Sequence, residues 1–341
     1  MHSSRFLKAI RQEPVDRPPV WVLRQAGRYD PEFQALRAQC PDFMAFCKQP
    51  ELACQATLIP IKKFQFDAAI IFSDILTLPH AAGQTVHFEK GIGPILSPPI
   101  RTSADYARIG MPDMEQDLGY VGQAIRMVKP ELSVPLIGFS GSPWTLACYM
   151  IEGRGKQGFK AAINATESQP KQLETLIQQL TDMVIDYLSY QAECGADCLM
   201  LFDSWASLLP PDAYRYFSLE PLKRITQTLK YKHNLPIILY ARMPPLALTE
   251  LNECHCDVLG LDEFQNIKNA RQLLGPQITL QGNLAPQQLL TNPKNIETAT
   301  LGMLKQHPEP GYIANLGHGI LPETPIENLQ AFVNTVQNYT P

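Results

Sequence analysis

The segment Pro19-Val-Trp-Val-Leu23, which stops at the polar stretch Arg24-Gln-Ala-Gly-Arg28, is the first of eight short apolar runs in the sequence. The other seven cover residues 68–72, 134–139, 198–202, 236–240, 257–261, 277–280 and 312–316. Continuous apolar runs of this length are typical of strands that are buried on both faces, as in a parallel sheet. The runs therefore predict eight parallel strands.

Stretches with helical periodicity lie between most of these runs. Residues 171–194, 219–232 and 287–306 each space their apolar side chains as one face of a helix. Repeated alternation of strand and helix, with no break in composition, predicts a single α/β domain over residues 1–341. The predicted fold is a (β/α)₈ TIM barrel with its active site at the carboxyl ends of the strands. A doubly wound open sheet is the alternative, and the count of eight favours the barrel. A small hairpin is expected within residues 84–100.

The composition limits the classes of function. The 341 residues are 45% hydrophobic and 18% charged, with a net charge of −4, as in ordinary soluble globular proteins. The lack of lysine and arginine blocks argues against nucleic-acid binding. No apolar run approaches the roughly 20 residues that span a bilayer, and the amino terminus lacks the apolar core of a signal peptide. We therefore expect a cytoplasmic protein that binds neither nucleic acid nor membranes.

Three motifs that suggest other chemistry fail in their context. The residues from Gly153 to Gly158 match the dinucleotide pattern G-x-G-x-x-G, but they follow a helical stretch instead of a strand. The residues from Gly138 to Ser142 lack the second glycine of a serine-hydrolase elbow. Among the eight cysteines, only Cys254-His-Cys256 clusters with ligand chemistry, and a buried thiol is ordinary before an apolar strand. The sequence therefore indicates no evident cofactor site.

Polar, small or glycine residues follow nearly every apolar run, at the end where a barrel builds its active site. Arg24 and Arg28 offer planar forks of donors that match a carboxylate or phosphate. Asp74 closes the run at 68–72, and His318 lies between two glycines. These residues predict a site that holds an anionic ligand with arginines and presents one carboxylate to a cationic or N–H-rich group.

Each of these residues also has a structural alternative. Two arginines in a surface loop are common, and Asp74 is a good helix N-cap before Ile75. His318 can equally be a polar loop histidine. Tyr149 and Ser204 can each donate a hydrogen bond to a ligand, or serve in core packing and helix capping.

Two long segments resemble the signatures of the uroporphyrinogen decarboxylase family: residues 19–32 (PVWVLRQAGRYDPE) and 138–153 (GFSGSPWTLACYMIEG). Four shorter segments fit the same family in order along the chain: FSDIL from Phe72, FDSW from Phe202, LQGNL from Leu280 and NLGHGILPETP from Asn315. The resemblance spans residues 3 to about 335, and this combination of motifs is highly specific.

The resemblance implies a carboxy-lyase of haem and tetrapyrrole biosynthesis that folds as a (β/α)₈ barrel. It implies conversion of uroporphyrinogen III to coproporphyrinogen III, in which four acetate side chains lose their carboxyl groups and become methyl groups. No cofactor is implied, and the expected assembly is a cytoplasmic homodimer. The implied substrate-binding residues are Arg24, Gln25, Ala26, Gly27, Arg28, Arg37, Asp74, Tyr149, Ser204 and His318.

The resemblance assigns catalysis to Asp74, Arg24 and Arg28. Asp74 resembles the aspartate that accepts hydrogen bonds from the pyrrole N–H groups, and the arginines resemble residues that bind carboxylates. Loss of CO₂ leaves a carbanion, whose electrons a pyrrole protonated on carbon can accept. Asp74 would stabilise that positive charge. The proton donor stays open between Arg24, acting through water, and Arg28, because a guanidinium group is a poor general acid.

The chain departs from the family pattern on one wall of the site. A glycine-rich turn is replaced by YARMPP from Tyr240, and a Leu-Asp-Trp segment becomes LDEF from Leu261. Arg242 and Glu263 then either pair with each other or alter the rim. Two other functions stay open. Related barrels are zinc-dependent methyltransferases that act on corrinoids and need His and Cys ligands, and a tetrapyrrole carrier would bind the substrate without releasing CO₂.

Overall fold

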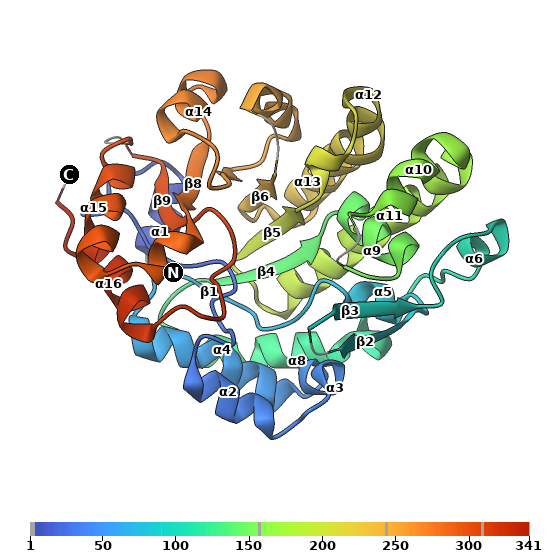
Figure 1. Ribbon diagram of the computed structural model, residues 1–341, viewed down its shortest axis with the longest axis horizontal. Helices are drawn as coiled ribbons and strands as arrows, with labels where there is room; N and C mark the ends of the chain where they lie inside the picture. Colours follow the sequence, from blue (N-terminus) through green and yellow to red (C-terminus); the bar gives the residue numbers. More distant parts are fainter. Residues whose placement is uncertain (1–3, 90, 156–157, 243–244, 308–309, 341) are drawn as a thin grey trace.

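A curved parallel sheet forms the centre of the protein, and helices pack around its outer side (Figure 1). The computed structural model describes residues 4–89, 91–155, 158–242, 245–307 and 310–340. Within these residues, seven strands follow the order β1-β4-β5-β6-β7-β8-β9, and neighbouring strands are parallel. Their bounds are β1 (Ala69–Ile70), β4 (Leu136–Gly141), β5 (Cys198–Asp203), β6 (Ile237–Ala241), β7 (Val258–Gly260), β8 (Thr279–Leu284) and β9 (Tyr312–Leu316).

The predicted first strand, residues 19–23, lies between β9 and the chain that leads into β1. Val20 forms a single parallel bridge with Ala314 of β9, and Trp21 N donates to the same residue's carbonyl oxygen at 3.3 Å. On the other side, Asp67 N donates to Val20 O at 2.9 Å. The segment begins with prolines, which have no N–H to donate to a ladder. The α/β class and seven of the eight predicted parallel strands are confirmed, whereas the predicted first strand is reduced to a one-residue bridge.

Buried polar side chains hold this segment in place. Trp21 Nε1 donates to Gln281 Oε1 at 2.9 Å, and Leu23 N donates to Asn315 Oδ1 at 3.0 Å. Both pairs are buried, so losing one partner would leave a polar group without a hydrogen bond, at a cost of about 1–3 kcal/mol. The start of the loop that carries Arg24 is thereby fixed against β8 and β9.

The helices surround the sheet, and α4 packs beside α8, α11 beside α13, and α15 beside α16. The α-helices are α1 (Arg5–Ile10), α2 (Pro31–Ala38), α3 (Phe43–Cys47), α4 (Pro50–Phe64), α5 (Thr77–Ala81), α6 (Ser103–Ala107), α7 (Met114–Asp117), α8 (Gly119–Val128), α9 (Pro143–Glu152), α10 (Lys160–Ser168), α11 (Pro170–Cys194), α12 (Pro211–Tyr214), α13 (Glu220–His233), α14 (Ile267–Leu274), α15 (Pro293–Leu304) and α16 (Ile326–Gln337). The 3₁₀ helices are η1 (Lys129–Glu131), η2 (Ala206–Leu208), η4 (Pro245–Cys254) and η5 (Pro286–Leu290), and η3 (Arg215–Leu219) is a π-helix.

Most of the predicted helices are confirmed, with one correction. Residues 171–194 and 219–232 correspond to α11 and α13. The prediction of one helix over residues 287–306 is wrong, because the chain forms η5 and then α15. Asn292 caps α15 by accepting from Asn295 N at 3.0 Å, and a proline occupies the first helical position. The expected hairpin is confirmed as antiparallel β2 (Thr85–Glu89) and β3 (Gly93–Ser97).

Apolar side chains fill the layer between the sheet and its helices. Leu173 and Leu180 of α11 are fully buried, as are Trp21 and Trp144. No helix in the described part of the chain is both long and apolar enough to cross a membrane. Because the strands are parallel, their carboxyl ends share one edge of the sheet, and the loops that follow them meet there.

Candidate active site

The loop after residue 23 and the loop after β9 lie against each other at this edge. Leu23 O accepts from Ile320 N at 3.0 Å. Arg24 has a left-handed backbone (φ 60°). Its side chain passes so close to Gly319 that a Cβ there would lie 2.5 Å from Arg24 Cδ. Any larger residue at position 319 would displace Arg24, which explains one of the two glycines around His318.

Asp74 follows β1 and lies half-buried. Its Oδ1 accepts from Leu76 N at 2.8 Å, and its carbonyl oxygen accepts from Thr77 Oγ1 at 2.8 Å. Burial raises the pKa of Asp74, against the Leu76 hydrogen bond and the Arg24 guanidinium, which both lower it. The N-cap of α5 is Leu76, so the N-cap alternative for Asp74 is wrong, and its contact with a ligand stays a prediction. One carboxylate oxygen organises the start of α5, and the carboxylate stays within electrostatic reach of Arg24.

Tyr149 projects from α9 within electrostatic reach of both Asp74 and Arg24. Burial raises the pKa of this phenol to about 12, so it keeps its proton at neutral pH and can donate a hydrogen bond. Its ring packs edge-on against Phe159, with 5.2 Å between centroids, and against Trp205, with 6.4 Å. These contacts fix the direction in which the hydroxyl group points.

A buried carboxylate that is absent from the predicted site holds the next wall together. Asp203 accepts from Ser142 Oγ at 2.7 Å, from Thr145 Oγ1 at 3.1 Å and from Ser218 Oγ. Burial raises its pKa, and the three hydroxyl groups oppose that effect. The network joins the end of β5 to the start of α9 and to η3, and it fixes the backbone beside half-buried Ser204. The partners lie 15, 58 and 61 residues from Asp203 in the chain, so no local sequence pattern signals this network.

His318 lies half-buried between positive groups. Burial lowers its pKa, and the guanidinium groups of Arg24 and Arg242 lower it further. The carboxylate of Glu263 acts in the opposite direction. The imidazole is therefore neutral at pH 7, and it can donate from one ring nitrogen and accept at the other.

Gln25 points away from this cluster and ties the loop to the sheet. It is 1% exposed. Its Nε2 donates to Ala68 O at 2.9 Å, and its Oε1 accepts from Ile70 N at 3.4 Å. The side chain thus replaces ladder hydrogen bonds that a full strand at residues 19–23 would make with β1. Its place is structural, and contact with a ligand stays a prediction.

Ala26, Gly27 and Arg28 form the outer part of the same loop. A Cβ at Gly27 would lie 3.2 Å from Arg24 O and 3.3 Å from Tyr29 Cδ1, so the loop is tightly closed there. The Arg28 side chain is exposed, and among the described residues it forms no hydrogen bond or ion pair. Its guanidinium is therefore available to a carboxylate ligand, and that contact stays a prediction.

Arg37 lies on α2, apart from the cluster. Its guanidinium donates to the carbonyl groups of Cys40 and Pro41, at 2.9 Å for Pro41. The same group lies 5.3 Å and 5.4 Å from the ring centroids of Phe43 and Phe46. These contacts hold Arg37 against the connection between α2 and α3. Within the described residues it makes no hydrogen bond or ion pair with another predicted site residue.

Arg242 and Glu263 form an ion pair, with 3.9 Å between Nη2 and Oε1. The first of the two alternatives for these residues, mutual pairing, is therefore confirmed. Tyr240, two residues earlier, is buried and donates from its hydroxyl to Gly317 O at 3.0 Å. Residues 243 and 244 of the predicted loop lie outside the described residues.

The cysteine cluster has the properties of structural thiols. Cys254 and Cys256 are buried and free, and burial raises the pKa of both, so they stay protonated at neutral pH. In the ranges that the structure describes, no group of three or more His, Cys, Asp and Glu side chains is arranged to hold a metal ion. The dinucleotide-like motif that begins at Gly153 directly follows α9, as expected, and its residues 156 and 157 lie outside the described ranges.

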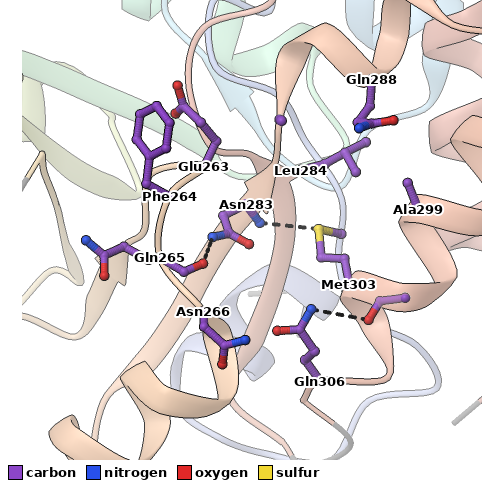
Figure 2. A pocket seen from close by; sticks show the side chains of 12 residues that line it. Glu263, Phe264, Gln265, Asn266, Asn283, Leu284, Gln288, Ala299, Met303 and Gln306 are labelled. Carbon is purple, nitrogen blue, oxygen red and sulfur yellow. Dashed lines mark hydrogen bonds between the residues drawn. The ribbon is translucent and has the colours of Figure 1, made fainter.

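A groove of about 500 Å³ lies between the loop after β7, the end of β8 and α15 (Figure 2). Glu263 and Phe264 line one side of it, and Met303 lines the other. Asn283 Nδ2 donates to Gln265 O at 2.6 Å, and Asn283 N donates to Met303 Sδ at 3.2 Å. None of the predicted site residues lines this groove, so it lies outside the predicted site and touches it only through Glu263.

The whole chain matches one protein family. Residues 1–339 match the family model described as Uroporphyrinogen decarboxylase (URO-D). The chain belongs to the uroporphyrinogen decarboxylase family. A Coxiella burnetii protein named uroporphyrinogen decarboxylase is 47% identical over 346 residues, which cover 100% of this chain and 96% of that protein. A Pseudoalteromonas atlantica protein of the same name is 43% identical over 346 residues, covering 100% of this chain and 98% of its own length.

A solved structure supports the architecture of this family member. The structure is described as a methyltransferase from Methanosarcina mazei, and it superposes with a TM-score of 0.81 at 22% sequence identity. The match covers 98% of this chain and 97% of that one. At such low identity the likeness shows a shared fold alone.

Proposed function

We propose that the chain converts uroporphyrinogen III to coproporphyrinogen III by removing the carboxyl groups of four acetate side chains, with no cofactor. The observation that carries the proposal is the proximity of Asp74 and Arg24 at the carboxyl ends of the strands. This substrate needs a carboxylate to accept from its pyrrole N–H groups and a guanidinium to bind its carboxylate arms. The family match over the whole chain supports the same reaction.

The chemistry of the substrate explains why one carboxylate is needed. Uroporphyrinogen carries eight carboxylates on its rim and four pyrrole N–H groups that can turn inward. Asp74 Oδ1 already accepts from Leu76 N at 2.8 Å, which fixes the direction of the carboxylate. The other oxygen would accept hydrogen bonds from the pyrrole N–H groups. The charged arms would then project outward to the arginines.

Each decarboxylation needs an electron sink and three proton transfers, with a net uptake of one proton. A proton first adds to a pyrrole carbon, and the ring becomes cationic. The bond between the acetate methylene and its carboxylate then breaks, CO₂ leaves, and the electron pair moves into the ring. Protonation of the exocyclic carbon and loss of the added ring proton leave a methyl group on a neutral pyrrole. Asp74 would stabilise the cationic ring, because a fixed charge in a half-buried site opposes developing charge without reorganisation.

The side chains around Asp74 would hold the substrate for this step. Tyr149 keeps its phenolic proton and would donate to a carboxylate arm, with Ser204 and His318 as further polar contacts. Arg24 and Arg28 would bind acetate or propionate groups. One of the two arginines, Arg24 through water or Arg28 directly, would deliver the proton. Gln25, Ala26 and Gly27 of the same loop, and Arg37 of α2, are further proposed contacts.

We further propose that residues 1–341 form one domain, that the enzyme is cytoplasmic and that it works as a homodimer. Light scattering coupled to size-exclusion chromatography would give about twice the 38.2 kDa mass of one chain. A mass equal to one chain at micromolar concentration would contradict the dimer. The proposed decarboxylation does not depend on that result.

The test is anaerobic incubation of the purified protein with uroporphyrinogen III. Products are oxidised and separated by the number of their carboxyl groups. The proposal predicts successive appearance of porphyrins with seven, six, five and four carboxylates and release of CO₂. A protein that binds the octacarboxylate but releases no CO₂ would be a tetrapyrrole carrier, and the proposed reaction would be wrong.

A further inference from the structure

Three groups that carry or can carry positive charge gather at the mouth of the site, where the loops after the strands meet: Arg24, Arg242 and His318. We call them the basic rim. The guanidinium groups of both arginines act on the pKa of His318, and Arg24 lies against Gly319, the residue after that histidine. Like charges gathered this closely repel one another unless an anion balances them. Within the described residues, the carboxylate that pairs with the rim at Arg242 is Glu263.

The pair formed by Arg242 and Glu263 is loose for its surroundings. Its shortest nitrogen–oxygen distance is 3.9 Å, although the two side chains are only 27% and 11% exposed. The pair of Arg215 and Glu250 is closer, at 3.1 Å, although Arg215 is 64% exposed. A half-buried pair gains more from close contact than an exposed pair, because the dielectric screening is weaker. The attraction between Arg242 and Glu263 is therefore weaker than a closer contact of the same two groups would give.

The Glu263 carboxylate is also incompletely satisfied. Its Oε2 is buried and has no hydrogen-bond partner among the described residues. A buried acceptor without a donor raises the free energy of the folded state. The Glu263 side chain is therefore not in its most stable arrangement. The guanidinium of Arg242 also contacts the Phe264 ring, 5.9 Å from its centroid.

The backbone that carries the pair is tightly fixed. A Cβ on Gly317 would lie 2.3 Å from Glu263 N, so the two loops are in direct contact. Tyr240 Oη donates to Gly317 O at 3.0 Å, and Asp262 Oδ1 accepts from Phe264 N at 2.9 Å. A rigid backbone with loosely engaged side chains suits a site in which one carboxylate exchanges for another.

We propose that Arg242 binds a carboxylate arm of the tetrapyrrole substrate, and that Glu263 holds this place in the free enzyme. Substrate binding would replace the Glu263 carboxylate with a substrate carboxylate at the same guanidinium. Exchange of one anion for another keeps the charge of the rim balanced. Glu263 would then lower the affinity for arms that cannot displace it, so the pair selects for substrates with many carboxylates. This inference rests on the proposed function.

The groove beside the rim gives the displaced side chain somewhere to go. Glu263 lies at the edge of the open space of about 500 Å³ between the β7 loop, β8 and α15 (Figure 2). A rotation about its side-chain bonds would carry the carboxylate from Arg242 into that groove. There it regains water, which offsets the loss of its partner.

The test combines two single variants and their double variant. Arg242→Met removes the guanidinium, and Glu263→Gln removes the competing charge with little change of shape. Binding of uroporphyrin, the oxidised octacarboxylate, is measured by its fluorescence. KM and kcat for uroporphyrinogen III are measured anaerobically. We expect Arg242→Met to weaken binding and raise KM by about tenfold with kcat changed less than about twofold, since a bidentate contact to a carboxylate arm is lost. We expect Glu263→Gln to strengthen binding by about threefold.

The double variant separates competition from simple structural support. If Glu263 acts only through Arg242, the double variant binds as weakly as Arg242→Met, and the gain from Glu263→Gln disappears. Arg215→Met, which removes one partner of the exposed pair with Glu250, is the matched control and should bind as the wild type does. Circular dichroism identifies any variant that fails to fold, and Arg242→Gln then replaces Arg242→Met.

Two results would overturn the inference: unchanged affinity in Arg242→Met, or equal weakening by Arg242→Met and Glu263→Gln. The second result would mean that the pair stabilises the wall as a unit. Binding is measured apart from turnover. A wild-type protein that binds uroporphyrin but releases no CO₂ would therefore refute the proposed function and leave the test of the rim intact.

Discussion

The charged side chains on the two sides of the mouth differ in how closely their partners hold them. On one side, Asp74 is held by a 2.8 Å hydrogen bond from Leu76 N, and Arg24 passes directly over Gly319. On the other side, Arg242 and Glu263 stay 3.9 Å apart, and one oxygen of Glu263 has no partner in the described part of the chain. Charge that must be in place for a reaction is preorganised. Charge that only has to receive flexible arms can be left adjustable.

The sequence differs between the same two sides. The Asp74 side carries the segments that resemble the family signatures, from residues 19 to 32 and from 72 to 76. The Arg242 side is where the chain departs from the family pattern, at residues 240–245 and 261–264. The comparison therefore predicts that loss of the Asp74 charge affects turnover, and that changes at Arg242 and Glu263 affect affinity and selectivity.

The largest expected effect comes from Asp74→Asn. The side-chain oxygen of asparagine accepts a hydrogen bond as an aspartate oxygen does, so the hydrogen bond from Leu76 N and the fold should survive. Without the negative charge, the cationic ring is not stabilised, and kcat should fall by about 10²- to 10³-fold with a much smaller change in KM. Steady-state assay of product porphyrins measures both constants.

The matched control for that change is Asp113→Asn. Asp113 caps α7, where its Oδ1 accepts from Glu115 N and Gln116 N at 3.0 Å and 2.9 Å. Like Asp74, this surface aspartate accepts a hydrogen bond from the backbone N–H two residues further on. Normal turnover in the control together with near-normal turnover in Asp74→Asn would show that the two sides of the mouth do not differ in the proposed way.

The next effect in size is expected for Arg28→Lys. An ammonium group is a point charge and cannot reproduce the bidentate fork of a guanidinium, so KM should rise by about tenfold. Arg37→Lys should raise KM by less than about threefold, because Arg37 already donates to the Cys40 and Pro41 carbonyl groups. Kinetics of both variants under identical conditions test the ranking. A larger effect for Arg37→Lys would place the anion site closer to α2.

The smallest expected effect is a shift in the pH profile. If Asp74 must be charged, kcat/KM falls as the pH drops through its pKa. Burial raises this pKa, so the acid limb should lie above the ordinary aspartate value of about 4. The Arg24 guanidinium lowers the pKa of Asp74, so Arg24→Met should move the limb to still higher pH. The profile of kcat/KM for the two proteins measures the shift.

The control for Arg24→Met is Arg28→Met, which changes the outer part of the same loop. Arg28 is not among the groups that act on the pKa of Asp74, so the acid limb should keep its position even though activity drops. A limb that shifts equally in both arginine variants would mean that general loss of positive charge, and not the contact with Arg24, sets the pKa.

The strand pattern of the fold could be predicted because each strand is buried on both faces and therefore appears as a continuous apolar run. The pattern fails where a segment is buried but does not form the backbone hydrogen bonds of a strand. Residues 19–23 are apolar and buried, yet the side chains of Gln25 and Asn315 take over hydrogen bonds of a ladder. An apolar run reports burial and does not report which groups satisfy the backbone.

The site could be predicted to the level of which strand ends carry chemistry. The place of Asp74 near Arg24 follows from adjacent carboxyl ends at one edge of the sheet. The Asp203 network could not be predicted, because its hydroxyl donors come from distant positions in the chain. The pairing of Arg242 with Glu263 was one of two open alternatives. Its loose geometry depends on loop packing at Gly317, which no residue pattern encodes.

The most direct test of the contrast between the two sides is equilibrium binding of uroporphyrinogen III to the Asp74→Asn enzyme under anaerobic conditions. Quenching of tryptophan fluorescence reports binding, because Trp205 packs against Tyr149 at the site. We predict that the Asp74→Asn enzyme binds uroporphyrinogen III with a dissociation constant within about threefold of the constant that the wild-type enzyme has for uroporphyrin. Its release of CO₂ should be lower than that of the wild type by at least about 10²-fold. Loss of binding in parallel with turnover would contradict the account, because Asp74 would then belong to the binding side of the mouth.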